Sequence, residues 1–150
     1  MALAEQIQND TKAALLGGNR FVGETLRNLK AAILNEEVAQ GKRDTGLSDA
    51  EIEQIVAREV KKRHESVKLY EANGRPELAE PEKKEIAVLE AYLPTQLSEQ
   101  ELLVLIDEQI ATMGADLSKM GQVIGAVKAQ VGTSADGATI AALVKQALSK

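Results

Sequence analysis

Residues 47–74 read LSDAEIEQIVAREVKKRHESVKLYEANG, and this stretch carries the clearest structural signal in the chain. Ser48 is a helix N-cap residue, and Glu51 follows three positions later, which is the spacing of a capping box. Leu47 and Ile52 occupy the two positions of the hydrophobic staple that accompanies such a cap. Apolar residues then recur at helical spacing until Asn73-Gly74, a typical stop. The stretch predicts one helix of about 25 residues, roughly twice the usual length, and its thin apolar stripe favours paired helices over a round bundle.

The rest of the sequence has the same helical period. No segment alternates apolar and polar residues as a half-buried strand does. A second capping box with its staple is formed by Ser98 and Glu101, and Pro81 suits the first turn of a helix. The fold class predicted is all-α, with further helices at about 2–16, 19–40, 81–92, 98–113, 118–131 and from 136 onward.

A domain boundary is predicted at Leu93-Pro94, because a residue that precedes proline is disfavoured in the α region. After Pro94 the helices become shorter and the composition shifts to Ala, Val and Gly. We therefore expect an elongated N-terminal helical domain over residues 1–94. A three-helix bundle is expected over residues 95–150.

Composition excludes several classes of site. The 150 residues contain no Cys and no Trp, a single histidine (His64), and only 2% aromatic residues. Disulfides, thiolate metal sites and multi-histidine metal sites are therefore excluded, and so are the aromatic platforms of sheet-based RNA binders. The longest apolar runs are five residues, far short of a membrane span, and residues 1–12 lack an apolar signal core. These observations predict a protein of the cytoplasm that makes no membrane contact.

No catalytic constellation is found in the sequence. His64 stands between Arg63 and Glu65, which is typical of a solvated surface residue. Acidic pairs such as Glu36-Glu37 fit a solvated helix better than a cation site, and no glycine-rich loop has the lysine that a phosphate loop needs. We predict no catalytic residue, no cofactor and no metal, and the chain is not expected to be an enzyme on its own.

Positive charge is concentrated near the C-terminus and on the long helix. Residues 117–150 contain four lysines against Asp136 alone, whereas residues 95–116 contain five acids and no base. Gly121 and Gly125 have a spacing that favours close packing against a neighbouring helix, with access for a phosphate backbone as the alternative. The candidate nucleic-acid-binding residues are Lys119, Gly121, Gln122, Gly125, Lys128 and Lys145, with Arg58, Lys61 and Lys62 as a second surface that also suits a solvated helix face.

The string Glu90-Ala-Tyr-Leu-Pro-Thr-Gln-Leu97 resembles the YqeY family, in which a Tyr-Leu-Pro-x-Gln-Leu string precedes a capped helix. The likeness extends to Met120-Gly-Gln-Val123, to Ala135-Asp-Gly137 and upstream to Asn35-Glu36. It covers essentially the whole chain. One departure is Thr133-Ser134, where relatives commonly carry a basic residue.

The tail is similar to the C-terminal domain of the B subunit of the tRNA-dependent amidotransferase. The resemblance implies a detached, non-catalytic module that handles tRNA or acts with the tRNA amidation or aminoacylation machinery. It also explains why the family is catalogued with carbon–nitrogen ligases that use glutamine as amido-nitrogen donor. The alternative is a protein–protein adaptor whose N-terminal helices bury their apolar seam against a partner helix or a second copy, without tRNA contact.

Overall fold

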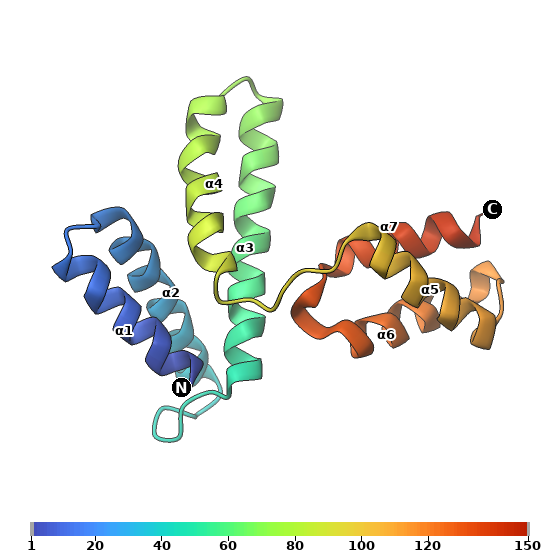
Figure 1. Ribbon diagram of the computed structural model, residues 1–150, viewed down its shortest axis with the longest axis horizontal. Coiled ribbons are helices and arrows are strands. Elements are labelled where there is room, and N and C mark those ends of the chain that lie inside the picture. Colours follow the sequence, from blue (N-terminus) through green and yellow to red (C-terminus); the bar gives the residue numbers. More distant parts are fainter. Residues whose placement is uncertain (1, 150) are drawn as a thin grey trace. The chain divides into compact units, whose positions relative to one another are not determined.

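A computed structural model describes residues 2–149, and Figure 1 shows their arrangement. The described residues form α-helices joined by turns and two short 3₁₀ helices, and they contain no strand, so the all-α prediction is confirmed. The chain divides between Leu93 and Pro94 into two compact units. We refer to them as the N-terminal unit and the C-terminal unit.

The N-terminal unit consists of two helical hairpins. Helix α1 packs along α2 and α3 packs along α4, while α2 also contacts both helices of the second hairpin (Figure 1). The helices are α1 (Leu3–Leu16), α2 (Arg20–Ala39), α3 (Asp49–Ala72) and α4 (Pro76–Glu90). The long third helix has a pairing partner in α4, as its thin apolar stripe predicted.

The capping box predicted at Ser48 is present at the start of α3. The Ser48 hydroxyl accepts a hydrogen bond from the Glu51 backbone N–H, and the Glu51 carboxylate accepts one from the Ser48 N–H. Asp49 accepts a further bond at 3.0 Å from the backbone N–H of Leu3, which satisfies one of the free donors at the start of α1. The starts of two helices from different hairpins are therefore joined through one carboxylate.

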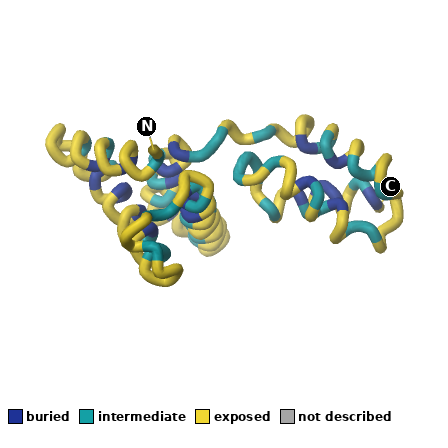
Figure 2. Tube along the Cα trace, turned by 90° about the horizontal axis from the view of Figure 1, so that it is seen from below, coloured by how far each residue is buried: buried dark blue, intermediate teal, exposed yellow. Residues whose placement is uncertain are grey.

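The apolar seam of the long helices is covered within the N-terminal unit. The seam residues of α2 and α3 pack into a single core, where they are almost fully buried: Leu26, Leu29, Ile33, Ile52, Val56 and Val60. Figure 2 shows the buried positions of the described chain as dark blue segments of the tube. This seam is consequently not free to meet a partner helix.

Helix α4 begins earlier than the sequence predicted. We expected a start at Pro81, but α4 starts at Pro76 and Pro81 lies inside it. Proline at the first helical position is favourable, whereas Pro81 deprives the Glu77 carbonyl of its i→i−4 donor. The helix continues through this defect, and Ala79, two residues before Pro81, is fully buried against the core.

A hydrogen bond between Tyr92 and Asp10 joins the end of the N-terminal unit to its first helix. The Tyr92 hydroxyl donates to Asp10 Oδ2 at 2.6 Å, and the tyrosine is 8% exposed. Burial raises the pKa of the Tyr92 phenol well above its ordinary value, and the hydrogen bond to Asp10 raises it further. The Tyr92 side chain is therefore protonated and neutral in the folded protein.

The C-terminal unit contains three α-helices around a second core. These helices are α5 (Glu99–Met113), α6 (Met120–Val131) and α7 (Gly137–Leu148), with the 3₁₀ helices η1 (Leu117–Lys119) and η2 (Gly132–Ser134) before and after α6. The core is aliphatic and formed by residues from all three helices: Leu102, Ile106, Val123, Val127, Ile140, Leu143, Val144 and Leu148. The capping box predicted at Ser98 and Glu101 is present at the start of α5.

The segment after Pro94 is tied to the C-terminal unit. The Gln96 side-chain amide donates to the backbone carbonyls of Pro94 and Thr133, both at 2.9 Å. The Leu97 N–H donates to the Ser134 carbonyl at 2.8 Å. The Pro-x-Gln-Leu string thus attaches the incoming chain to the η2 turn.

Candidate nucleic-acid interface

The two glycines of α6 lie on the exposed side of the helix. Val123 and Val127 are fully buried, whereas Gly121, Gln122, Gly125 and Lys128 are exposed. A Cβ atom added at either glycine would meet no heavy atom within 4 Å. The prediction that this Gly-x-x-x-Gly pair packs against a neighbouring helix is therefore wrong, because α6 turns its valines to the core and its glycines outward.

Gly23, by contrast, lies at a close contact between two helices. A Cβ at Gly23 would lie 2.5 Å from Leu15 Cδ2, so a side chain at this position would require Leu15 to move. Gly121 and Gly125 have no such neighbour. Each costs the helix about 1 kcal/mol relative to alanine, and no contact within the described residues offsets this cost.

Three lysines in the described part of the C-terminal unit have no carboxylate partner there. Lys119, Lys128 and Lys145 form no ion pair with any residue from 2 to 149. The chain turns back at η2, so Lys128 lies where α6 ends and α7 begins, whereas Lys119 and Lys145 lie toward the far ends of α6 and α7. The acidic side chains of this unit are concentrated on α5 and the turn that follows it.

Lys128 reaches across to the first turn of α7. A Cβ built at Gly137 would lie 2.9 Å from Lys128 Cε and 3.1 Å from its Nζ. Asp136 holds the N-cap position of α7 but makes no side-chain cap hydrogen bond. An ammonium and the N-terminal end of a helix dipole are both positive, and the Asp136 carboxylate at the N-cap offsets part of this positive charge. In the sequence, the one local signal for this contact is Gly137, whose missing side chain leaves room for Lys128.

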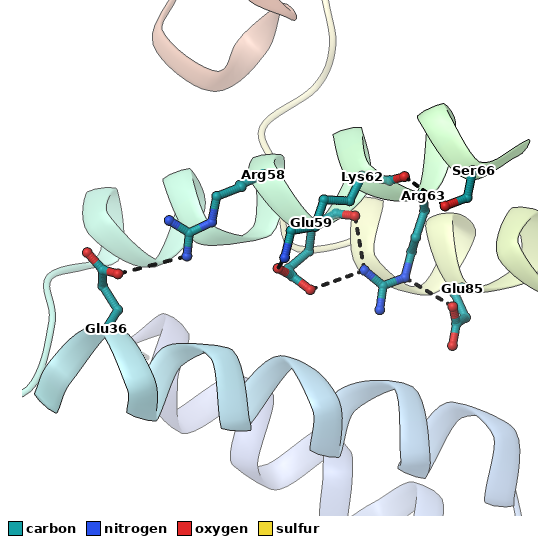
Figure 3. A network of polar contacts seen from close by, with 7 residues as sticks. All are labelled: Glu36, Arg58, Glu59, Lys62, Arg63, Ser66 and Glu85. Atoms are coloured by element: carbon teal, nitrogen blue, oxygen red, sulfur yellow. Dashed lines mark hydrogen bonds and ion pairs between the residues drawn. The ribbon is translucent and has the colours of Figure 1, made fainter. Parts of the chain in front are cut away.

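The second predicted surface, on α3, is occupied by ion pairs. Arg58 Nη2 lies 3.9 Å from Glu36 Oε2, and Lys62 Nζ lies 3.1 Å from Glu59 Oε2 (Figure 3). Lys61 is exposed and has no ion pair within the described residues. Of the three, Lys61 alone is therefore unpaired in the described part of the chain.

Arg63 is the centre of a network that sequence reasoning did not find. Its guanidinium bridges Glu59 at 3.2 Å and Glu85 at 3.1 Å, and all three side chains are largely buried between α3 and α4 (Figure 3). Burial acts to raise the pKa of Glu59, but hydrogen bonds from Lys62 and Arg63 outweigh it and hold that pKa below its ordinary value. Because Glu85 is 22 residues from Arg63, only the hairpin pairing brings the two together.

The described residues contain no group of three His, Cys, Asp or Glu side chains placed to hold a metal ion. His64 is half-exposed, with its Nε2 4.0 Å from Glu90 Oε1. Between residues 2 and 149, no helix combines the length and the apolar character needed to cross a membrane.

The fold and the exposed basic positions define a class of protein: a helical, two-unit protein with a candidate anion-binding surface on its smaller unit. A family model described as Yqey-like protein matches residues 4–148, and the chain belongs to this YqeY family.

Two curated relatives carry the name "Altered inheritance of mitochondria protein 41, mitochondrial". The protein of Clavispora lusitaniae is 28% identical over 109 residues, which cover 73% of this chain and 58% of the relative. The protein of Eremothecium gossypii is 31% identical over 87 residues, which cover 58% of this chain and 46% of the relative. The chain thus spans about half the length of these relatives.

The relatives contradict the prediction of a cytoplasmic location, because both are named as mitochondrial proteins. The prediction depended on missing cysteines and on the lack of an apolar core in residues 1–12. An apolar core marks secretion, whereas mitochondrial import is directed by amphipathic, Arg-rich segments, so the features considered could not discriminate between cytoplasm and mitochondrion.

Proposed function

We propose that the C-terminal unit binds the sugar–phosphate backbone of RNA, with tRNA as its ligand, and that it carries out no chemistry itself. The observation that carries the proposal is the pair of outward glycines on α6. A helix that lacks side chains on an exposed face lets another backbone approach closely, and here the approach is open on both glycines.

The charges around this face support a phosphate ligand. Lys119 and Lys128 flank the glycines on α6, and neither is neutralised by a carboxylate within residues 2–149. Gln122 lies beside Gly121 on the exposed side and supplies an amide that can donate to phosphate or to a 2′-hydroxyl. The start of α7, with Lys128 folded across it, adds a second position for a phosphate.

The similarity of the tail to the amidotransferase B subunit supports tRNA over other RNAs. In that enzyme the corresponding domain helps to hold tRNA while amide transfer takes place elsewhere. The same division of roles here would make the chain a holder of tRNA for an amidation or aminoacylation protein. It would require no catalytic residue in this chain.

The proposal is tested by the salt dependence of tRNA binding. Labelled bulk tRNA is titrated with the full chain and with the triple variant Lys119→Ala, Lys128→Ala, Lys145→Ala over a series of salt concentrations. If all three lysines meet phosphates, the slope of log K against log salt decreases by about 2–3 in the variant. The matched control is Lys30→Ala, Lys68→Ala, Lys84→Ala, which removes the same charge from exposed lysines of the N-terminal unit that form no ion pair with residues 2–149.

The control variant should bind with the slope of the parent chain. An equal loss of slope in both triple variants would show that only net charge matters and would contradict a site on α6 and α7. Failure of the parent chain to bind tRNA even at low salt would overturn the proposal itself.

A further inference from the structure

The turn between α1 and α2 exposes three large apolar side chains. Residues 15–21 are all exposed, and within them Leu16 is 90% exposed, Phe21 40% and Leu15 39%. We call these three residues, together with Lys12 and Arg20, the hairpin tip. Figure 1 shows this turn at one end of the α1–α2 pair.

The fold of the hairpin accounts for Leu15 but not for Leu16. Leu15 closes over Gly23 and so helps to join the two helices. Leu16 is 90% exposed, so packing within the hairpin does not explain an apolar residue at this position. Exposed leucines that stand singly need no explanation, but several large apolar side chains around one short turn mark an interaction site.

The charge around the hairpin tip is positive. The stretch from Thr11 to Gly23 contains Lys12 and Arg20 and no acidic residue, and it is bordered by Asp10 and Glu24. Lys12 stands four residues before Leu16, which places the two on the same face of α1. Arg20 pairs with Glu24 at 2.9 Å, yet its side chain remains 86% exposed. Other exposed apolar residues lie beside acids: Val38, which is 59% exposed, directly follows Glu36 and Glu37.

We propose that the hairpin tip is a peripheral contact for an anionic lipid surface. Leucine and phenylalanine at the end of a helical hairpin can enter the boundary between headgroups and acyl chains, while Lys12 and Arg20 meet lipid phosphates. A bilayer accepts a projecting turn without a complementary pocket, which a protein partner would have to supply. The contact requires no membrane-spanning helix, but it departs from the expectation, drawn from the sequence, that the protein makes no membrane contact. A single small tip gives weak, reversible and salt-sensitive binding, since stable anchoring takes two signals.

The absence of tryptophan from the chain makes the proposal directly testable. Leu16→Trp places a single fluorophore at the tip, and Val38→Trp places one at another exposed site, near the other end of α2. Each full-length variant is titrated with vesicles of phosphatidylcholine, and with vesicles of phosphatidylcholine mixed with phosphatidylglycerol. The expected result is a blue-shifted, saturable change for Leu16→Trp with the mixed vesicles, which weakens with salt. Val38→Trp should show no change.

Sedimentation with vesicles gives a second readout in the tryptophan-free chain. Leu16→Glu should lower the bound fraction at limiting lipid by about tenfold, the effect of one leucine removed from an apolar environment, and Val38→Glu should leave it unchanged. Three results would overturn the proposal: no change with the mixed vesicles, equal changes at both probes, or a blue shift of Leu16→Trp that grows with protein concentration without lipid. The last would identify a second copy as the occupant.

Discussion

Substitution of Gly121 or Gly125 should change the stability of the C-terminal unit and its affinity for RNA in opposite directions. Because an added Cβ meets open space at both positions, alanine should improve the helix while it obstructs a ligand that approaches the bare backbone. Few substitutions offer this combination, since a variant that loses binding often loses stability as well. Here the two effects have opposite signs.

We predict that Gly121→Ala and Gly125→Ala each raise the free energy of unfolding of the C-terminal unit by about 1 kcal/mol. The same variants should weaken tRNA binding, because the new methyl groups keep the backbone of the RNA away. Urea denaturation and tRNA titration of each variant measure the two effects. Gly23→Ala is the control, and should show no such gain because its Cβ would meet Leu15. Stabilised variants with unchanged tRNA affinity would remove the glycine face from the site.

Tyr92→Phe should lower the stability of the N-terminal unit by about 1–2 kcal/mol, because it removes a hydrogen bond to the Asp10 carboxylate. The folded-state pKa of Tyr92 is raised, so the stability that this group contributes is present below its ordinary pKa of about 10 and is lost as the pH rises beyond it. The difference between parent and variant should therefore shrink between pH 8 and pH 11. Denaturation of both proteins at the two pH values checks the sign, and a constant difference would contradict it.

The helix boundaries that could be predicted from the sequence are those set by neighbouring residues. Both capping boxes and the glycine stops are encoded within four residues, and Ser48 and Ser98 mark the starts of α3 and α5 as predicted. Contacts between distant residues were not predictable. The Tyr92–Asp10 hydrogen bond spans 82 positions, and Arg63 meets Glu85 only because α3 and α4 form a hairpin. The outward position of Gly121 depends on which face of α6 is buried, which glycine spacing alone does not specify.

Helix α4 contains one proline that suits its position and one that does not. Pro81→Ala restores a backbone donor to the Glu77 carbonyl and should raise the free energy of unfolding by about 1–3 kcal/mol. Pro76→Ala is the matched control. Proline is favourable at the first helical position, so the control should give no gain. Urea denaturation of both variants distinguishes the two positions, and equal effects would contradict this account of α4.

Residues 2–149 form two hydrophobic cores with no residue in common. One is built from α1 to α4 and the other from α5 to α7. Leu29, 1% exposed, belongs to the first, and Val127, fully buried, belongs to the second. The sequence suggested a boundary at Leu93-Pro94, because a residue that precedes proline is disfavoured in the α region and because the helices after Pro94 are shorter and richer in Ala, Val and Gly.

We predict that each unit unfolds as a separate cooperative transition. Leu29→Ala should destabilise the N-terminal unit by about 2–5 kcal/mol, while Val127→Ala should destabilise the C-terminal unit through the cavity that it leaves. Hydrogen exchange assigned by residue would show loss of protection confined to one unit in each variant. A loss of protection in both units from either substitution would indicate a single cooperative structure.

The attachment of Gln96 to Pro94 and Thr133 leaves the peptide between Leu93 and Pro94 as the junction of the two units. When two modules joined by so short a tether bind the same partner, the second contact forms at an effective concentration in about the millimolar range. Weak contacts on the two units therefore reinforce one another only where both meet one partner. Separate ligands on the two units would each bind with their own affinity.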